Sequence, residues 1–157
     1  MMIAHPPCTH LSVSGARWFK DKEDEQIDAI IFFLELVNAD DIPRICIENP
    51  VGIMSTIYRK PDQYIQPYQF GHDASKKTGL WLKGLPELVI DPSEYIPPRT
   101  INGKPRWANQ TDSGQNKLGP SENRATIRAK TYDGIARAMA RQWLPGKTNS
   151  AKSLLSF

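Results

Sequence analysis

The chain has 157 residues, the length of one domain, and its composition of 39% hydrophobic and 24% charged residues is that of a globular protein rather than a disordered one. Two cysteines exclude a disulfide framework and indicate a reducing compartment such as the cytoplasm, and no apolar run reaches the roughly 18–20 residues of a membrane span. The formal net charge is +3, but the charge is unevenly distributed: residues 1–98 hold 9 Lys and Arg against 14 Asp and Glu, whereas residues 99–157 hold 11 Lys and Arg against 3 Asp and Glu. The basic C-terminal third is expected either to bind a polyanion or to be a solvated tail.

The first predicted element is a short apolar strand over residues 1–4. The prolines at positions 6 and 7 stiffen the loop that follows, because their rings restrict the backbone. This loop presents Cys8 near its tip. The sequence therefore predicts a strand that leads directly into a rigid, cysteine-bearing loop.

A helix is predicted over residues 21–41. Its apolar side chains recur with the period of one helix face, and acidic residues crowd its first turn, where they favour the helix dipole. Asn38 suits the C-terminal end of such a helix. The apolar residues of the predicted face are Ile27, Ile30, Ile31 and Leu34, widened by Phe33 and Val37.

A second strand is predicted at Arg-Ile-Cys-Ile-Glu-Asn, residues 44–49, where branched apolar residues precede the Pro-Val-Gly of positions 50–52. A strand, a loop, a helix and another strand form a βαβ unit. The sequence therefore predicts an α/β fold whose partial Rossmann-like sheet is mostly parallel and flanked by helices. Cys46, inside this strand, is expected to be structural.

The rest of the chain divides into four predicted parts. Residues 76–90 are expected to form two strands around a turn at 84–86, which completes a first unit over residues 1–90. Residues 91–125 are rich in Pro, Gly, Asn and Ser and predict a basic irregular loop. A closing helix is expected from Asp133 to Trp143, within a segment of residues 126–145, followed by a tail over 146–157. Trp18, Trp81 and Trp143 are expected in the core.

Two loops leave the predicted parallel strands at the same rim of the sheet, where α/β proteins bind ligands. The first carries Cys8 and the second carries Glu48. A thiol on a rigid loop beside a carboxyl group is an arrangement typical of a nucleophile with an acid next to it. The alternatives remain a small buried cysteine and a salt-bridged glutamate.

Four segments in order resemble the DNA cytosine-5 methyltransferase family, with the closest likeness to short phage-borne members. The segment His-Pro-Pro-Cys-Thr-His-Leu-Ser (5–12) is similar to the family's Pro-Cys catalytic loop, and Glu-Asn-Pro-Val-Gly (48–52) is similar to its Glu-Asn-Val motif. Residues 68–84 and 127–143 resemble a later turn-and-strand segment and the closing helix. The resemblance spans residues 2 to about 144.

The resemblance implies a role for each matching residue. Cys8 would attack C6 of a flipped cytosine as a thiolate, Glu48 would hold the base at N3, and Asn49 would fix the loop. Lys76 and Lys77 stand where the family usually has arginines that touch base and phosphate. A lysine keeps the charge but loses the planar fork of arginine.

DNA is the expected partner, in the cytoplasm of a bacterial or phage-infected cell. A basic loop around Trp107 suits backbone contact and base stacking, with solvated surface as the equal alternative. The residues expected to bind substrate or nucleic acid are Ser12, Lys76, Lys77, Arg99, Lys104, Arg106, Arg128 and Lys130.

The resemblance also implies S-adenosylmethionine as the methyl donor. The motifs that bind it in the family lie upstream of the Pro-Cys loop, and here only seven residues precede Cys8. The chain is therefore expected to need a homodimer or a second polypeptide to complete the sheet and its cofactor site. Such a partner would cover the edge strand at residues 1–4.

Two other readings use the same residues. The chain is alternatively a catalytically inactive relative that binds nucleic acid or protein. A further alternative is a zinc site formed by His5, Cys8 and His10, with His72 as a fourth ligand, although His72 is more simply a loop histidine that hydrogen-bonds its neighbours.

Overall fold

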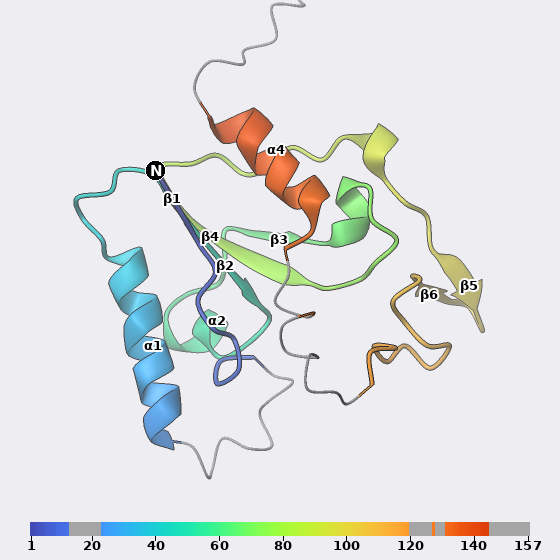
Figure 1. Cartoon of the computed structure of the whole chain (residues 1–157), viewed down its shortest axis with the longest axis horizontal. Helices are drawn as coiled ribbons and strands as arrows, with labels where there is room; N and C mark the ends of the chain where they lie inside the picture. Colours follow the sequence, from blue (N-terminus) through green and yellow to red (C-terminus); the bar gives the residue numbers. More distant parts are fainter. Residues whose placement is uncertain (13–22, 120–126, 128–130, 145–157) are drawn as a thin grey trace, which may run out of the picture.

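The computed structural model describes residues 1–12, 23–119, 127 and 131–144 of the chain (Figure 1). Its centre is a four-stranded sheet with the strand order β1-β2-β4-β3. The strands are β1 (Met2–Ala4), β2 (Ile45–Pro50), β3 (Gln63–Ile65) and β4 (Thr78–Lys83). Short helical turns lie between them: α2 (Met54–Ile57) after β2 and the 3₁₀ turn η2 (Pro67–Phe70) after β3.

The sheet is mixed, so the expectation of mostly parallel pairing is only partly met. Strands β1 and β2 pair in parallel, as predicted, and helix α1 (Glu23–Val37) comes between them in the chain. The other two pairings in the described sheet, β2 with β4 and β3 with β4, are antiparallel. Strands β1, β2 and β3 therefore share one direction and β4 alone is reversed. The β3–β4 connection needs no crossover helix, because antiparallel neighbours can be joined by a loop.

The two faces of the sheet bury different cores, because successive side chains of a strand point to opposite faces. Ile45 and Ile47 of β2 pack with Trp81 against α1. Cys46 and Leu80 pack on the other face. The second core also contains the apolar side of helix α4 (Asp133–Trp143), which lies on the opposite side of the sheet from α1 in Figure 1. The molecule is thus a helix–sheet–helix sandwich.

Helix α1 confirms the predicted helix but presents a shifted face. Phe33 is fully buried and meets Trp81 edge to face, with ring centroids 5.1 Å apart. Ile30 and Leu34 pack beside it, whereas Ile27 and Ile31 are half exposed. The largest side chain of the apolar stripe faces the sheet and so sets the rotation of the helix, because an aromatic side chain buries the most surface.

The prediction of a second strand within residues 76–90 is wrong. Only β4 forms, and residues 85–90 are in no strand. Glutamine side chains bind its backbone instead: Gln63 bonds both the N–H and the C=O of Leu88, at 2.8 Å each, and Gln142 does the same for Val89, at 2.8 and 2.9 Å. These side-chain bonds satisfy the backbone groups that a neighbouring strand would otherwise have to satisfy.

The irregular loop predicted over residues 91–125 contains regular structure where it is described. A 3₁₀ turn, η3 (Pro92–Glu94), precedes a hairpin of β5 (Arg99–Ile101) and β6 (Lys104–Arg106). Asn102 and Gly103 join the two strands with φ angles of 50° and 73°. Two positive φ angles are what a two-residue hairpin turn needs, and Asn-Gly is the pair that adopts them most readily.

The predicted closing helix is confirmed as α4, with the predicted bounds. Trp81 and Trp143 are buried as expected, and Trp18 lies outside the described residues. No helix of the described chain is long and apolar enough to cross a membrane.

Candidate functional site

The Cys8 loop and the end of β2 meet through the register of the parallel pair. Ile3 lies opposite Cys46 and Ala4 opposite Ile47, so the next positions, His5 and Glu48, fall on the same face of the sheet. Their side chains are in contact, with His5 Nδ1 3.1 Å from Glu48 Oε2. The predicted juxtaposition of this loop with Glu48 is therefore present, and His5 makes the contact.

Asn49 forms a second connection between the same two segments. Its side chain is buried, and Nδ2 donates a hydrogen bond of 3.0 Å to the backbone carbonyl of Pro6. A buried amide that binds a backbone carbonyl holds that backbone in one place, because breaking the bond leaves a buried polar group unsatisfied. The expectation that Asn49 fixes the Cys8 loop agrees with this contact.

The far side of the loop is closed by a tight turn. The Cys8 carbonyl accepts hydrogen bonds from the N–H groups of Leu11 and Ser12, at 3.1 and 2.9 Å. Ser12 forms a β-bridge with Gly52, and a side chain at Gly52 would place its Cβ only 2.0 Å from the Leu11 carbonyl oxygen. The Cys8 loop (residues 5–12) is thus attached to β2 and its following turn at both ends.

The two cysteines occupy different environments. Cys8 is half-buried in this loop, whereas Cys46 is fully buried within β2. Burial raises the pKa of the Cys46 thiol to about 12, and the negative charges of Glu48 and Asp62 add to the effect. Cys46 therefore stays a protonated core residue, as predicted, and Cys8 is the more accessible thiol.

A pocket of about 520 Å³ lies beside the Cys8 loop. Ser12 from the loop and Pro50 from the end of β2 form part of its wall, and three lysines line it: Lys76 and Lys77 before β4, and Lys117 after the hairpin. No described lining residue is acidic. The full set of described lining residues is Ser12, Pro50, Val51, Ser75, Lys76, Lys77, Asn109, Gln110, Gly114, Asn116, Lys117, Leu118, Ile127 and Tyr132.

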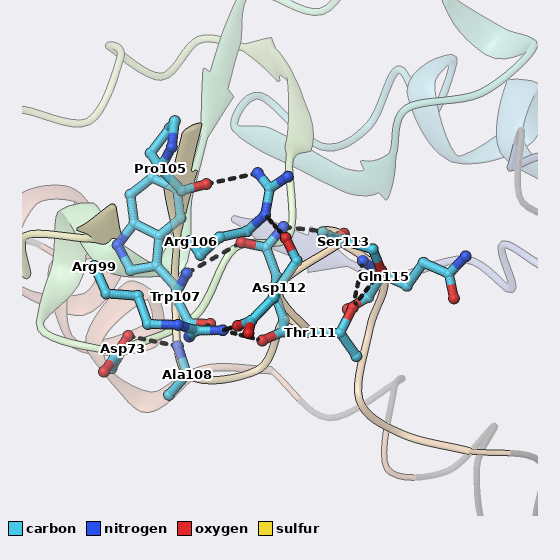
Figure 2. Close-up of polar contacts among 12 residues, drawn as sticks. Asp73, Arg99, Pro105, Arg106, Trp107, Ala108, Thr111, Asp112, Ser113 and Gln115 are labelled. Carbon is cyan, nitrogen blue, oxygen red and sulfur yellow. Dashed lines mark hydrogen bonds and ion pairs between the residues drawn. The ribbon is translucent and has the colours of Figure 1, made fainter. Parts of the chain in front are cut away.

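The predicted basic loop uses its arginines internally (Figure 2). Arg99 donates to the carbonyls of Trp107 and Gln110, at 2.8 and 2.6 Å, and to the Asp112 carboxylate at 3.1 Å. Arg106 donates to the carbonyls of Asp112 and Pro105. These contacts give both arginines a structural role in joining the hairpin to the segment after it, and nucleic-acid contact by either stays a prediction.

The sequence predicts either base stacking or solvated surface for Trp107, whereas in the structure this side chain is buried. Its ring stacks on Tyr68 with centroids 3.9 Å apart, and its Nε1 donates to the Ile96 carbonyl. Lys104 is exposed on the hairpin. Arg128 and Lys130 lie outside the described residues.

Two of the four residues of the predicted zinc site make other contacts. No group of three or more His, Cys, Asp or Glu side chains suited to a metal occurs in the part of the chain that is described. His5 contacts Glu48, and His72 Nε2 accepts a hydrogen bond of 2.8 Å from the Gly134 N–H. His72 is thus the loop histidine of the simpler reading.

Two features of the site were not predicted from the sequence. The first is the pairing of His5 with Glu48, which the strand register decides. The second is Lys117, which lines the pocket. Arg99 of the hairpin binds the Trp107 carbonyl, and Asn109 binds Ser75 shortly before β4, so the segment that carries Lys117 lies near β4. The Asn-Gly pair at 102–103 was the sequence signal for that fold.

Comparison with known proteins gives no match: no family model, no curated protein and no solved structure is significantly similar to the chain.

Proposed function

We propose that the chain is a nucleic-acid-directed protein in which Cys8 adds to C6 of a cytosine, as in the DNA cytosine-5 methyltransferases that its motifs resemble. The observation that carries the proposal is the double attachment of the Cys8 loop to β2, through His5 to Glu48 at 3.1 Å and through Pro6 to Asn49 at 3.0 Å. This attachment brings a nucleophile-bearing loop and an acid to one rim of a parallel strand pair, where α/β proteins bind their ligands.

The proposed chemistry requires the two side chains, the base and water. The Cys8 thiolate forms a bond to C6, and the electron pair of the C5–C6 double bond shifts through the ring toward N3, where Glu48 in its acid form donates a proton. C5 then has enamine character and takes a proton from water. The original C5 hydrogen leaves as a proton to water, and departure of the Cys8 thiolate with return of the N3 proton to the Glu48 carboxylate regenerates the cytosine.

The sheet is compatible with the finer fold that the resemblance implies. Three strands share a direction and β4 alone is reversed, and otherwise parallel sheets that carry a reversed strand are common in doubly wound folds. We therefore include a partial, methyltransferase-type Rossmann-like sheet in the proposal.

The proposal does not include a methyl-transfer step. S-adenosylmethionine carries a sulfonium and an ammonium cation against one carboxylate, so its net charge is positive, whereas the pocket beside the Cys8 loop has three lysines and no described carboxylate in its lining. That pocket does not fit the methyl donor. A homodimer or a second polypeptide that supplies the donor site remains part of the proposal.

Hydrogen exchange at C5 tests the proposal without a methyl donor. The full chain is incubated in D₂O with a single-stranded oligonucleotide that contains one cytosine, and deuterium at C5 is measured by mass spectrometry of the released nucleoside. We expect time-dependent deuteration by the wild-type chain and none above background by Cys8→Ala, because the S–C6 bond cannot form.

Cys46→Ala serves as the matched control, since Cys46 is buried in the sheet and its loss should leave the exchange measurable. Glu48→Gln should slow the exchange strongly, because an amide is a far weaker proton donor at N3 than a carboxylic acid. Equal exchange by the wild type and Cys8→Ala would refute the covalent role. Oligonucleotide binding with no exchange at all would instead support a binding module.

A further inference from the structure

The pocket beside the Cys8 loop gathers positive charge from two distant parts of the chain. Lys76 and Lys77 precede β4, and Lys117 follows the β5–β6 hairpin by eleven positions. Because none of the described lining residues is acidic, the pocket has an electrostatic preference for an anion.

Among the described residues, two of these ammonium groups pair with no carboxylate. The salt bridges of the described residues use Arg59, Lys83, Arg99 and Arg141 as cations, and Glu48 is in contact with His5, so neither Lys77 nor Lys117 takes part in a salt bridge. Lys77 Nζ instead lies 4.3 Å from the centroid of the Tyr64 ring. An aromatic ring holds a cation near its face but leaves its hydrogen-bond donors available to a ligand.

Neutral side chains hold the walls of the pocket in place. Asn109 accepts from the Ser75 N–H and donates to the Ser75 carbonyl, at 2.9 Å each. The Lys117 N–H donates to the Asn109 carbonyl, also at 2.9 Å, and Asn116 Oδ1 accepts from Leu118. The backbone that carries Lys117 is therefore hydrogen-bonded, through Asn109, to the segment that carries Lys76 and Lys77. Backbone contacts, and not only the length of the lysine side chains, place the three residues at one cavity.

The size and position of the pocket narrow the class of anion. A volume of about 520 Å³ is within the range of small-molecule and nucleotide sites, roughly 300–1,000 Å³. Its wall includes Ser12, whose N–H bonds the Cys8 carbonyl at 2.9 Å, and Pro50, two positions after Glu48. Ammonium groups bind phosphate as point charges, without the need for a planar fork.

We call the cavity lined by Lys76, Lys77 and Lys117 the lysine pocket. From these observations we infer that the lysine pocket binds a phosphate group of a polynucleotide strand, at the nucleotide next to the base that approaches Cys8. Lys117 is one of the residues that bind this phosphate. The inference rests on the proposed function in one respect: that function places the reacting base next to Cys8. The phosphate contact itself does not require that chemistry to occur.

The test compares Lys117→Ala with Lys83→Ala in the full chain. Lys83 is the matched control because its ammonium already binds the Ala39 carbonyl and pairs with Asp40, away from the pocket. Affinity for a fluorescein-labelled single-stranded oligonucleotide is measured by anisotropy between about 50 and 200 mM salt. We expect Lys117→Ala to weaken binding about fivefold at the lowest salt and to reduce the slope of log K against log salt by roughly 0.7, the value for one phosphate contact on a single strand. Lys83→Ala should change neither quantity.

Two outcomes would overturn the inference. The first is an unchanged affinity and slope in Lys117→Ala, with a wild-type thermal unfolding midpoint to show that the variant is folded. The second is binding of cytidine monophosphate as tight as that of the oligonucleotide, which would make the pocket a site for free nucleotides. Cys8→Ala separates this inference from the proposed function, because it should keep oligonucleotide binding with the full salt slope while C5 exchange is lost.

Discussion

Asn49 shows how much of the candidate site depends on a single side chain. Its amide lies in the core at 1% exposure and joins β2 to Pro6, two residues before Cys8. His5, on the same loop, is exposed at the edge of the site and contacts Glu48. The loop is therefore held by a buried hydrogen bond and by a partly exposed His5–Glu48 contact. The buried bond is expected to contribute more, because polar contacts at exposed positions contribute little.

Asn49→Ala is predicted to destabilise the fold by about 1–3 kcal/mol, since it leaves the Pro6 carbonyl without its buried donor. Urea denaturation followed by circular dichroism measures this change. Asn38→Ala is the control: Asn38 is exposed after the end of α1 and should alter stability by less than about 0.5 kcal/mol. A loss in Asn49→Ala no larger than in Asn38→Ala would show that the bond does not hold the loop.

The start of helix α4 packs closely against η2 because Gly134 has no side chain. The Gly134 N–H donates to His72 Nε2 at 2.8 Å, and the backbone of η2 passes against the same residue. A Cβ at this position would lie 1.8 Å from the Phe70 carbonyl oxygen, which is backbone and cannot rotate away. The start of α4 is therefore set by a close approach of two backbones.

Gly134→Ala is predicted to destabilise the protein by about 1–3 kcal/mol, although alanine favours a helix, because the added methyl group forces α4 away from η2. Gly119→Ala provides the matched control, since no described atom lies within 4 Å of the position that its Cβ would occupy. Thermal unfolding of the two variants measures the difference. A Gly134→Ala variant as stable as the wild type would mean that α4 can shift without cost.

At the scale of the whole molecule, Trp143 connects three separate segments. Its ring is 1% exposed, its Nε1 donates to the Pro86 carbonyl at 3.0 Å, and its own carbonyl accepts a bond from Arg44 just before β2. The end of α4 thus fixes both the chain after β4 and the entry to β2. The same core contains Cys46 and Leu80, so the helix covers the face of the sheet that carries Glu48.

Trp143→Ala is predicted to cost about 3–5 kcal/mol, because it empties a large buried volume and leaves the Pro86 carbonyl without its donor. Leu144→Ala, one residue further along and 52% exposed, should cost much less. Urea denaturation of both variants measures the two losses. Similar losses in the two variants would contradict the role of Trp143 as the joint between these segments.

The sequence by itself determined the elements whose signals are local. The period of the apolar residues predicted α1, the stop at Pro145 predicted the end of α4, and the branched residues of 44–49 predicted β2. The shared rim of the Cys8 loop and Glu48 also followed from the sequence, because a parallel strand pair places both carboxyl ends at one edge.

Only the tertiary structure decided the features that depend on distant partners. The reversed direction of β4, the glutamine contacts that replace a second strand after Gly84, and the rotation of α1 set by Phe33 against Trp81 all involve residues far apart in the chain. The same is true of the lysine pocket, where Lys117 meets Lys76 and Lys77 across a hairpin. Local patterns determine which backbone conformation a segment prefers, whereas these contacts depend on which segments compete for the same buried surface.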